Sequence, residues 1–383
     1  MKPIKNLIII VFVLMSMESM AQNSKQRSFT PGAIRPDNNG VHINAHGGGM
    51  LFHEGKYYWF GEHKIEGEAG NRAQVRVHCY SSDNLYNWKD EGIVLKVSDD
   101  AESPIVKGCI IERPKVIYNK KNNQFVMWFH HELKGMGYDA AKTGLAVADK
   151  VIGPYTYIHS INPNKGDWPL NVRPVHKQPV PETTEPSYCG GPGCLPAHPD
   201  TVNILGRDFQ KGQMSRDMTL FVDDDDTAYH IHSSEENSTM HISKLSDDYL
   251  SLTDEFVWVF PNRYMEAPSI FKHKGKYYFI ASGCTGWAPN EARLAVADNI
   301  YGPWTELGNP CVVDGKETTF DSQSTYILPV HGKENAFIFM ADRWRPENAI
   351  DGRYIWLPVQ FNKKGNPYLE WMDEWNFAVF NKK

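Results

Sequence analysis

Four carboxylates and one amide lie at the edges of short apolar runs that are far apart in the chain: Glu62, Glu112, Asp217, Glu266 and Gln323. Carboxyl groups transfer protons near neutral pH when burial or a neighbouring charge moves their pKa. Glu266 is the best candidate, because Met265 and Ala267 flank it at the start of an expected strand and would partly desolvate it. Desolvation raises the pKa of a carboxyl group, as a general acid requires. The alternative is an ordinary glutamate at the edge of a strand.

Glu112 follows two isoleucines and is followed by Arg113 and Lys115. This pattern fits either an internal salt bridge or a hydroxyl-binding carboxylate that the cations hold in place. Near the last expected strand, Asp321 and Gln323 would face the same side of an extended chain, because side chains alternate with a period of two.

Five segments share one pattern, in which a short apolar run meets a turn and then an aromatic-rich strand: Gly47–Glu62, Arg113–Glu132, Asp217–Glu235, Ala267–Gly283 and Ser324–Trp344. A second repeat relates Leu145–Tyr155 to Leu294–Trp304, each a strand followed by a Gly-Pro turn. Repeats of this kind predict an all-β fold, a five-bladed β-propeller. Because a propeller brings the inner strands of all blades to one axis, the separated polar residues can line a single pocket.

Composition restricts the class of protein. The 383 residues carry a net charge of −6 and no basic run, which argues against a nucleic-acid partner. The 11 Trp, 18 Tyr and 18 Phe fit strand packing first, and stacking against the apolar face of a sugar second. Asp223–Asp226 reads as a hairpin turn rather than a cation site. No histidine spacing typical of catalytic zinc and no phosphate-binding or dinucleotide-binding motif is present, so no metal ligand is assigned.

The N-terminus has the pattern of a secretory signal peptide, with Lys2 and Lys5 before an apolar stretch and a small-residue cleavage site ending at Ala21. The sequence therefore predicts a signal peptide over 1–21, an extended lead-in over 22–40 and a catalytic propeller over 41–383. It also predicts a secreted or periplasmic location. No further run is long and apolar enough for a membrane span.

The Pro/Gly-rich stretch 162–214 breaks the repeat, and is expected to be either a surface insertion or one wall of the pocket. Cys189 and Cys194 lie within it, separated by glycines and a proline. Their spacing favours a disulfide over thiols or a metal site.

From about Val41 to Phe380 the chain resembles the propellers of glycoside hydrolase family 43, most closely the branch that contains exo-β-1,3-galactanases. The segments that carry the resemblance include His46–Met50, Tyr58–Glu62, Glu112–Lys115, Ser215–Thr219, Glu266–Pro268, Ser282–Trp287 and Phe320–Ser324. Two positions depart from the wider family, since Ala45–Gly47 replaces the expected aspartate base and Glu112–Lys115 the expected Ala-Pro-Asp. Both departures agree with the galactanase-like branch.

The resemblance implies an inverting exo-glycosidase that acts on galactosyl linkages of β-1,3-galactan in arabinogalactan. Glu266 would be the general acid, Gln323 would hold the water, with an imidic acid tautomer as one way of acting as base, and Glu112 would contact the substrate. The resemblance assigns substrate binding to Glu62, Tyr138, Asp217, Asn237, Thr285 and Trp287, the last as a stacking floor. A structural calcium on the axis is a further expectation that no motif fixes.

Two alternatives stay open: an α-L-arabinofuranosidase or β-galactofuranosidase of the same family, and a non-catalytic glycan-binding propeller. In each case the partner is an oligosaccharide or polysaccharide, and a monomer is expected.

Overall fold

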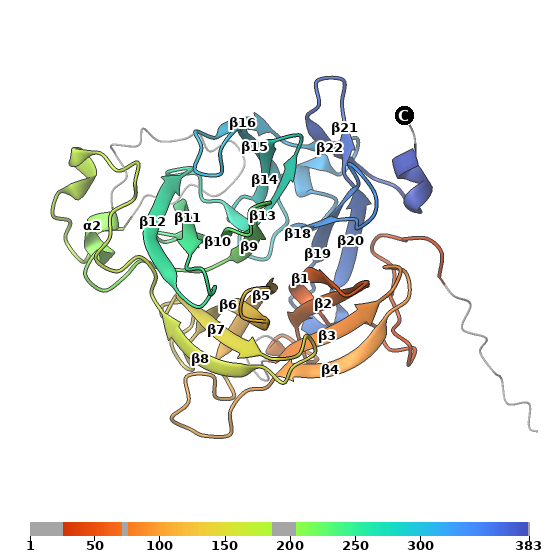
Figure 1. Ribbon diagram of the computed structural model, residues 1–383, viewed down its shortest axis with the longest axis horizontal. Helices are drawn as coiled ribbons and strands as arrows, with labels where there is room; N and C mark the ends of the chain where they lie inside the picture. Colours follow the sequence, from red (N-terminus) through yellow and green to blue (C-terminus); the bar gives the residue numbers. More distant parts are fainter. Residues whose placement is uncertain (1–25, 71–75, 186–203, 382–383) are drawn as a thin grey trace, which may run out of the picture.

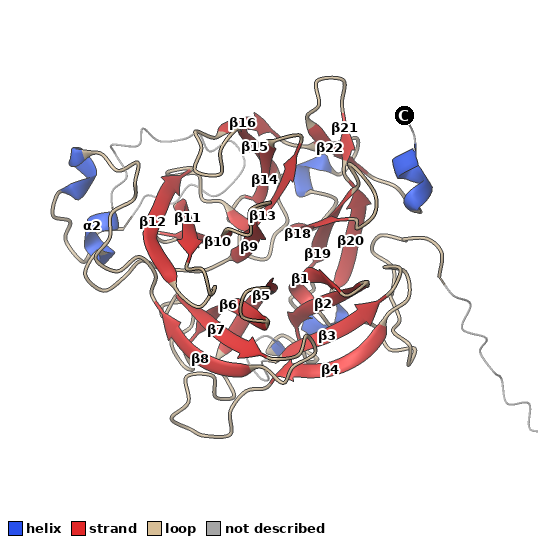
Figure 2. Ribbon diagram, in the orientation of Figure 1, coloured by secondary structure: helices blue, strands red, loops and turns tan. Residues whose placement is uncertain are grey.

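The computed structural model describes residues 26–70, 76–185 and 204–381. The described chain is built almost entirely of strands that form sheets arranged around a centre, with only a few short helical turns (Figures 1 and 2). The first sheet contains β1 (His46–His53), β2 (Lys56–Glu62), β3 (Val77–Ser82) and β4 (Lys89–Leu95). The second sheet contains β5 (Ile110–Asn119), β6 (Gln124–Glu132), β7 (Lys142–Ala148) and β8 (Thr156–Ile161).

The remaining sheets follow the same order. The third sheet contains β9 (Met218–Val222), β10 (Ala228–Ser234), β11 (Thr239–Leu245) and β12 (Leu252–Val259). The fourth contains β13 (Glu266–His273), β14 (Lys276–Ser282), β15 (Arg293–Ala297) and β16 (Thr305–Gly308). A further sheet contains β18 (Gln323–Pro329), β19 (Phe337–Arg343) and β20 (Arg353–Pro358). The helical turns are η1 (Pro174–Lys177), α2 (Leu205–Asp208), η3 (Lys316–Thr318), η4 (Ala349–Asp351) and η5 (Phe377–Asn381).

The prediction of five blades is wrong, because the described strands form six sheets and the fold is a six-bladed propeller by this count. The additional sheet consists of β17 (Cys311–Val312), β21 (Gln360–Phe361) and β22 (Pro367–Glu370), and it packs beside β20. Its strands are two to four residues long. Strands this short carry no repeat from which a sheet could be predicted, and β17 is also distant in sequence from its parallel partner β22. The all-β class is confirmed.

Both repeats that suggested blades are confirmed as structural units. The Gly55 and Gly275 turns close the hairpins β1–β2 and β13–β14, which have the same antiparallel register. The second repeat is β7 and β15, each followed by a cis Gly-Pro bond, at Gly153-Pro154 and Gly302-Pro303. Asp223–Asp226 forms the turn between β9 and β10.

The first strands of five sheets, β1, β5, β9, β13 and β18, neighbour one another in a closed ring around the centre. Between adjacent sheets, aromatic and aliphatic side chains form separate packed cores, of which the largest buried residues include Trp59, Trp128 and Trp356. The abundant aromatic residues therefore serve first to fill the wedges between sheets. No helix among the described residues has the length and apolar character to cross a bilayer.

The described parts of the 162–214 stretch lie outside the ring, where α2 is labelled in Figure 1. They reach the pocket wall through Arg207, which pairs with Glu236 at 2.8 Å, and Glu236 in turn pairs with Arg216 at 3.1 Å. Cys189 and Cys194 lie outside the described residues, as does the predicted signal peptide. The lead-in is tied to the far end of the chain, since Phe29 and Trp375 exchange backbone hydrogen bonds of 2.7 and 3.0 Å.

Candidate functional site

A cavity of about 330 Å³ opens where the first strands of the sheets converge. Its lining consists of Glu62, Lys64, Glu112, Arg113, His130, Tyr138, Arg216, Asp217, Asn237, Glu266, Gly286, Trp287, Gln323 and Trp344. Register explains why these residues meet. A residue at or near the start of an inner strand pairs with the end of the next strand, as in Glu112 with His130, Glu266 with Ser282 and Gln323 with Asp342. Side chains at these positions all point toward the same end of the ring.

Three of the inner strands have the same irregularity next to the cavity. In β1, β5 and β13 the register shifts just after the first or third residue, and the residue at the shift has a positive φ: Gly47 (59°), Arg113 (55°) and Ala267 (54°). A β-bulge of this kind re-aims the neighbouring side chain and is common beside active sites. Positive φ costs about 1 kcal/mol or more for a residue with a Cβ, so a specific interaction must hold it.

A carboxylate from another sheet provides that interaction each time. Glu62 Oε1 accepts the Arg113 N–H at 2.9 Å, and Asp217 Oδ2 accepts the Ala267 N–H at 2.9 Å. Asp342 Oδ2 accepts the Gly47 N–H at 2.7 Å. Glu62 and Asp217, which were expected to bind sugar hydroxyls, therefore also fix the backbone of the adjacent sheet.

Arg113 connects the walls of the cavity. Its guanidinium donates to both carboxylate oxygens of Asp217, at 3.1 and 2.9 Å, to Ser324 O at 3.0 Å and to Gln323 Oε1 at 2.6 Å. Its charge also lies 5.4 Å from the centre of the Trp344 ring. The planar fork of arginine suits this two-point contact with a carboxylate, which lysine cannot reproduce.

The Gln323 amide is held in one orientation. Its Oε1 accepts from Arg113 and from Trp344 Nε1 (3.0 Å), and its Nε2 donates to Ser282 Oγ at 3.0 Å. An imidic acid tautomer would place a hydroxyl proton on Oε1, where two N–H donors already point. This geometry favours the ordinary amide.

Glu266 has the pKa expected of a general acid. Burial raises the pKa of its carboxyl group, the negative charge of Asp217 raises it further, and the pKa reaches about 7 although Cys284, Arg113 and Arg216 act in the opposite direction. Asn237 Nδ2 donates to Glu266 Oε1 at 3.0 Å. At neutral pH about half of such groups carry a proton.

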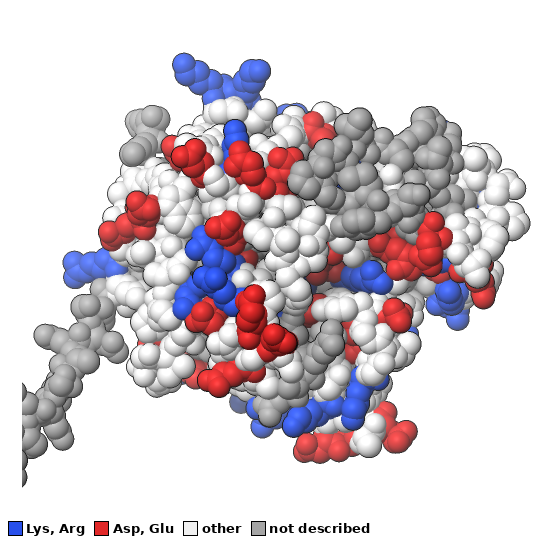
Figure 3. Space-filling view, turned by 180° about the vertical axis from the view of Figure 1, so that it is seen from behind, with Lys and Arg blue, Asp and Glu red and all other residues white. Residues whose placement is uncertain are grey.

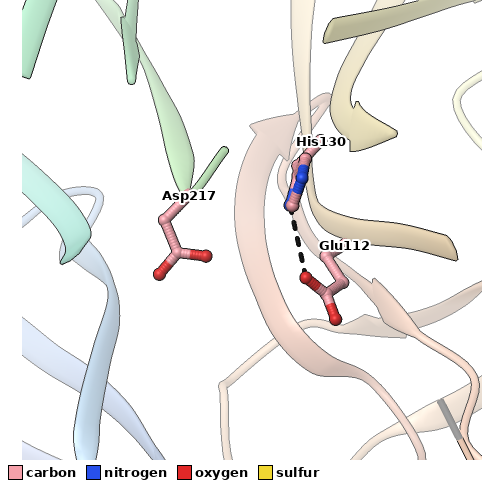
Figure 4. A group of neighbouring side chains, drawn as sticks. All are labelled: Glu112, His130 and Asp217. Carbon is pink, nitrogen blue, oxygen red and sulfur yellow. Dashed lines mark ion pairs between the residues drawn. The ribbon is translucent and has the colours of Figure 1, made fainter. Parts of the chain in front are cut away.

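Glu112 has the opposite character. Burial alone would raise its pKa, but His130, Lys64 and Tyr138 outweigh burial and lower the pKa to about 2. Figure 4 shows the ion pair between His130 and Glu112, which measures 3.2 Å. The other ring nitrogen of His130 lies 2.8 Å from Glu132. Burial would lower the pKa of His130, but the two carboxylates raise it to about 9, so it is an imidazolium at neutral pH.

Glu112, His130 and Asp217 offer ligand atoms within 4.8 Å of one another, and Asp217 points toward the other two from a different sheet (Figure 4). They do not suit a metal ion. His130 is protonated between Glu112 and Glu132, and both oxygens of Asp217 already hold Arg113. Lys115, buried between the inner strands, donates from Nζ to Gly47 O at 2.9 Å, and burial together with the charge of Arg113 lowers its pKa to about 7. The expected calcium gains no support from these donors.

Most of the residues proposed from sequence line this one cavity, but two do not. Thr285 is outside the lining set, because its hydroxyl donates to Ala288 O at 2.6 Å within its own loop. The expectation that Asp321 shares a strand face with Gln323 is wrong. Thr319, Phe320 and Asp321 have positive φ and the strand begins only at Gln323, so Asp321 turns to Thr318, from which it accepts a hydrogen bond of 2.9 Å.

Sequence reasoning did not single out Lys64, Arg113, His130, Arg216, Gly286 and Trp344 as cavity residues. The repeat contained a usable signal for two of them. His130 and Trp344 lie at or near the end of the second strand of their hairpins, as Glu62 does in the first hairpin. Lys64 pairs with Glu62, two residues away, and both are buried.

Seen from the face opposite to Figure 1, acidic and basic side chains lie next to each other around the middle of the molecule (Figure 3). The described residues on this face form no broad basic field of the kind that binds nucleic acid.

Comparison with known proteins places this site in context. Residues 200–367 match Glycosyl hydrolases family 43. The solved GH43 β-1,3-galactosidase BT3683, with galactodeoxynojirimycin, is 52% identical with a TM-score of 0.85, over 91% of this chain and 100% of that one.

The exo-β-1,3-galactanase of Phanerochaete chrysosporium, with β-1,3-galactotriose, is 32% identical with a TM-score of 0.72, over 92% of this chain and 68% of that one. The exo-β-1,3-galactanase of Clostridium thermocellum is 32% identical with a TM-score of 0.73, over 91% and 66% respectively. A search of curated proteins found no match.

Proposed function

Because the chain belongs to glycosyl hydrolase family 43 and is therefore a glycoside hydrolase, we propose that it removes galactose from the ends of β-1,3-galactan chains. The observation that carries this proposal is Glu266, whose pKa of about 7 makes it a proton donor at neutral pH inside the cavity. The volume of about 330 Å³ suits a terminal sugar, and the solved relatives named above act on β-1,3-linked galactose.

In this reaction the proton of Glu266 passes to the glycosidic oxygen as the bond between that oxygen and C1 breaks. A water oxygen bonds to C1 from the opposite face and releases its proton to bulk solvent, so the configuration at C1 inverts. Gln323 positions this water. Its own oxygen already accepts from Arg113 and Trp344, which supports a positioning role rather than that of a proton acceptor.

The other polar residues hold the sugar. Glu112 is ionised, because its pKa is about 2, and accepts hydroxyl protons, while Tyr138 donates to it at 2.8 Å. Trp287 is 49% exposed and its ring lies 5.9 Å from that of Trp344 in an edge-to-face arrangement, so an indole face remains for the apolar side of a sugar. Residues 1–21 direct export in this proposal, which mass spectrometry of the exported protein would test by finding an N-terminus at Gln22.

The test is incubation of residues 22–383 with β-1,3-galactan, arabinogalactan and arabinan, with chromatography of the released sugars. We expect galactose from the first two substrates. Glu266→Gln should reduce the rate by about 10³-fold or more, because a general acid contributes about 10² to 10⁴.

The control is Glu54→Gln, a change at a side chain that is 85% exposed on a hairpin turn, which should leave the rate unchanged. Release of arabinose instead would indicate an arabinofuranosidase. Binding of galactan without release of sugar by the unmodified protein would contradict the proposal and favour a glycan-binding propeller.

A further inference from the structure

One carboxylate oxygen of Glu266 receives two hydrogen bonds, and both come from loops of neighbouring strands. Asn237 Nδ2 donates to Oε1 at 3.0 Å and Cys284 Sγ donates to the same Oε1 at 3.2 Å. Asn237 Nδ2 also lies 3.7 Å from Cys284 Sγ, so the three side chains form a compact group. Cys284 follows β14 and Asn237 lies in the turn between β10 and β11.

We propose that Asn237 and Cys284 are positioning residues that keep Oε1 of Glu266 as an acceptor and so place the transferable proton on Oε2. A carboxyl group has one proton, and a proton on Oε1 would face an N–H and an S–H donor. On Oε2 it avoids both donors and is available to the glycosidic oxygen. This inference rests on the proposed function, in which Glu266 is the acid.

The thiol remains a donor over the pH range in which Glu266 titrates. Burial raises the pKa of Cys284, and the charge of Glu266 beside it raises it further, to about 12. The S–H therefore persists at neutral pH and favours the ionised form of Glu266. The Cys284 thiol thus lowers the pKa of Glu266, against burial and the charge of Asp217, which raise this pKa by more.

Both donors are held by rigid surroundings. The loop that carries Cys284 is fixed by Asn290, which accepts the Gly283 N–H at 2.6 Å and donates back to Gly283 O at 3.1 Å. The turn that carries Asn237 has three consecutive residues with positive φ. Within it, Glu235 lies 2.9 Å from His241 and Glu236 pairs with Arg216 and Arg207. Such support keeps the two donors in place without substrate.

The test compares Cys284→Ala, Cys284→Ser and Asn237→Ala in two assays. Removing a donor to the ionised carboxylate raises the pKa of Glu266, so the alkaline limb of the kcat/KM profile should move up by about one pH unit in Cys284→Ala. Cys284→Ser, which restores a donor, should return the limb toward its original position. The control Cys109→Ala removes another buried thiol, which belongs to a hydrophobic core and not to the cavity lining, and should leave the limb where it is.

The second assay compares leaving groups. A β-1,3-linked galactobiose needs protonation of its leaving oxygen, whereas 4-nitrophenyl β-galactoside needs little. We expect Cys284→Ala and Asn237→Ala to lower kcat by about 10-fold or more on the first substrate and by much less on the second. An equal loss on both substrates, or an unmoved alkaline limb in the folded variants, would overturn the proposal.

A readout without turnover separates this proposal from the proposed function. Titration of the Glu266 carboxyl carbon by ¹³C NMR should show the same upward shift in Cys284→Ala. If that shift occurs but the unmodified protein releases no galactose, the hydrogen-bonding arrangement is supported and the assigned reaction is not. Absence of the shift would contradict the arrangement whatever the activity.

Discussion

Arg113 and Asp217 form a two-point ion pair across adjacent sheets, with N–O distances of 3.1 and 2.9 Å. Asp217 also accepts the N–H of Ala267, the residue after Glu266, and raises the pKa of Glu266 by its charge. One carboxylate therefore holds the central arginine, fixes the backbone beside the acid and contributes to the pKa of that acid.

Asp217→Asn should shift the activity profile to lower pH. The carboxylate of Asp217 raises the pKa of Glu266 from its ordinary value, so removing this negative charge lowers the pKa and Glu266 loses its proton earlier as pH rises. We expect the alkaline limb of kcat/KM to move down by about one pH unit, opposite to the shift in Cys284→Ala. Asp247→Asn, at a side chain that is 91% exposed, is the control. A limb that stays near pH 7 would contradict the role given to Asp217.

Gln323→Ala should lose activity by about 10² to 10³-fold, because the water is no longer positioned. Small anions such as azide can enter the space left by the side chain and attack C1 in place of water. Rate recovery with azide, and a glycosyl azide of inverted configuration by NMR, are the expected results. A product of retained configuration would show that the reaction is not a single inversion.

The ion pair of His130 should make stability depend on pH. The folded-state pKa of His130 is raised from 6.5 to about 9. The contribution of His130 to the free energy of unfolding is therefore complete below pH 6.5 and is lost as pH rises through 9. The folded-state pKa of Glu112 is lowered to about 2, so the contribution of Glu112 to the free energy of unfolding is present above pH 4.5 and is lost as pH falls through 2. The free energy of unfolding in urea should therefore fall by up to about 3 kcal/mol between pH 6.5 and 9.

His130→Gln removes the titrating group and should abolish this slope, although it destabilises the protein at all pH values by about 3 kcal/mol because Glu112 and Glu132 remain buried without their cation. The exposed His331 provides the control, since His331→Gln should keep the slope. An unchanged slope in His130→Gln would assign the dependence to another group.

Gly47→Ala tests the hydrogen bond by which the Glu62 carboxylate holds the backbone N–H of Arg113. A Cβ at Gly47 would lie 2.0 Å from Glu62 Oε1, the atom that accepts the Arg113 N–H. Gly55 also has a positive φ but nothing within 4 Å of the added atom, so Gly55→Ala measures the backbone cost alone, about 1 kcal/mol. We expect Gly47→Ala to be clearly more destabilising than Gly55→Ala in thermal unfolding, and to reduce activity as well. Equal losses of stability in the two variants would contradict a structural role for the hydrogen bond between Glu62 and the Arg113 N–H.

The local pattern of the sequence was sufficient for the strands, the hairpins at Gly55 and Gly275 and the position of the Asp223–Asp226 turn. These features depend on neighbouring residues, namely the period-two alternation and the turn residues. The same repeats indicated that Glu62, Glu112, Asp217, Glu266 and Gln323 would meet, because equivalent positions in a propeller face the same end. The flanking residues of Glu266 correctly suggested a raised pKa.

Only the tertiary structure decided what these groups do to one another. The sixth sheet consists of strands of two to four residues and includes a parallel pair between β22 and the distant β17, and such pairing leaves no local signal. The interactions of Arg113 with Asp217 and Gln323 join residues from three sheets. Against the effect of burial, His130, Lys64 and Tyr138 lower the pKa of Glu112 to about 2, whereas burial and Asp217 raise that of Glu266 to about 7. A pKa depends on burial and on charges within a few ångströms, and in this fold some of those charges, such as Asp217 beside Glu266 and Lys64 beside Glu112, come from other hairpins of the chain.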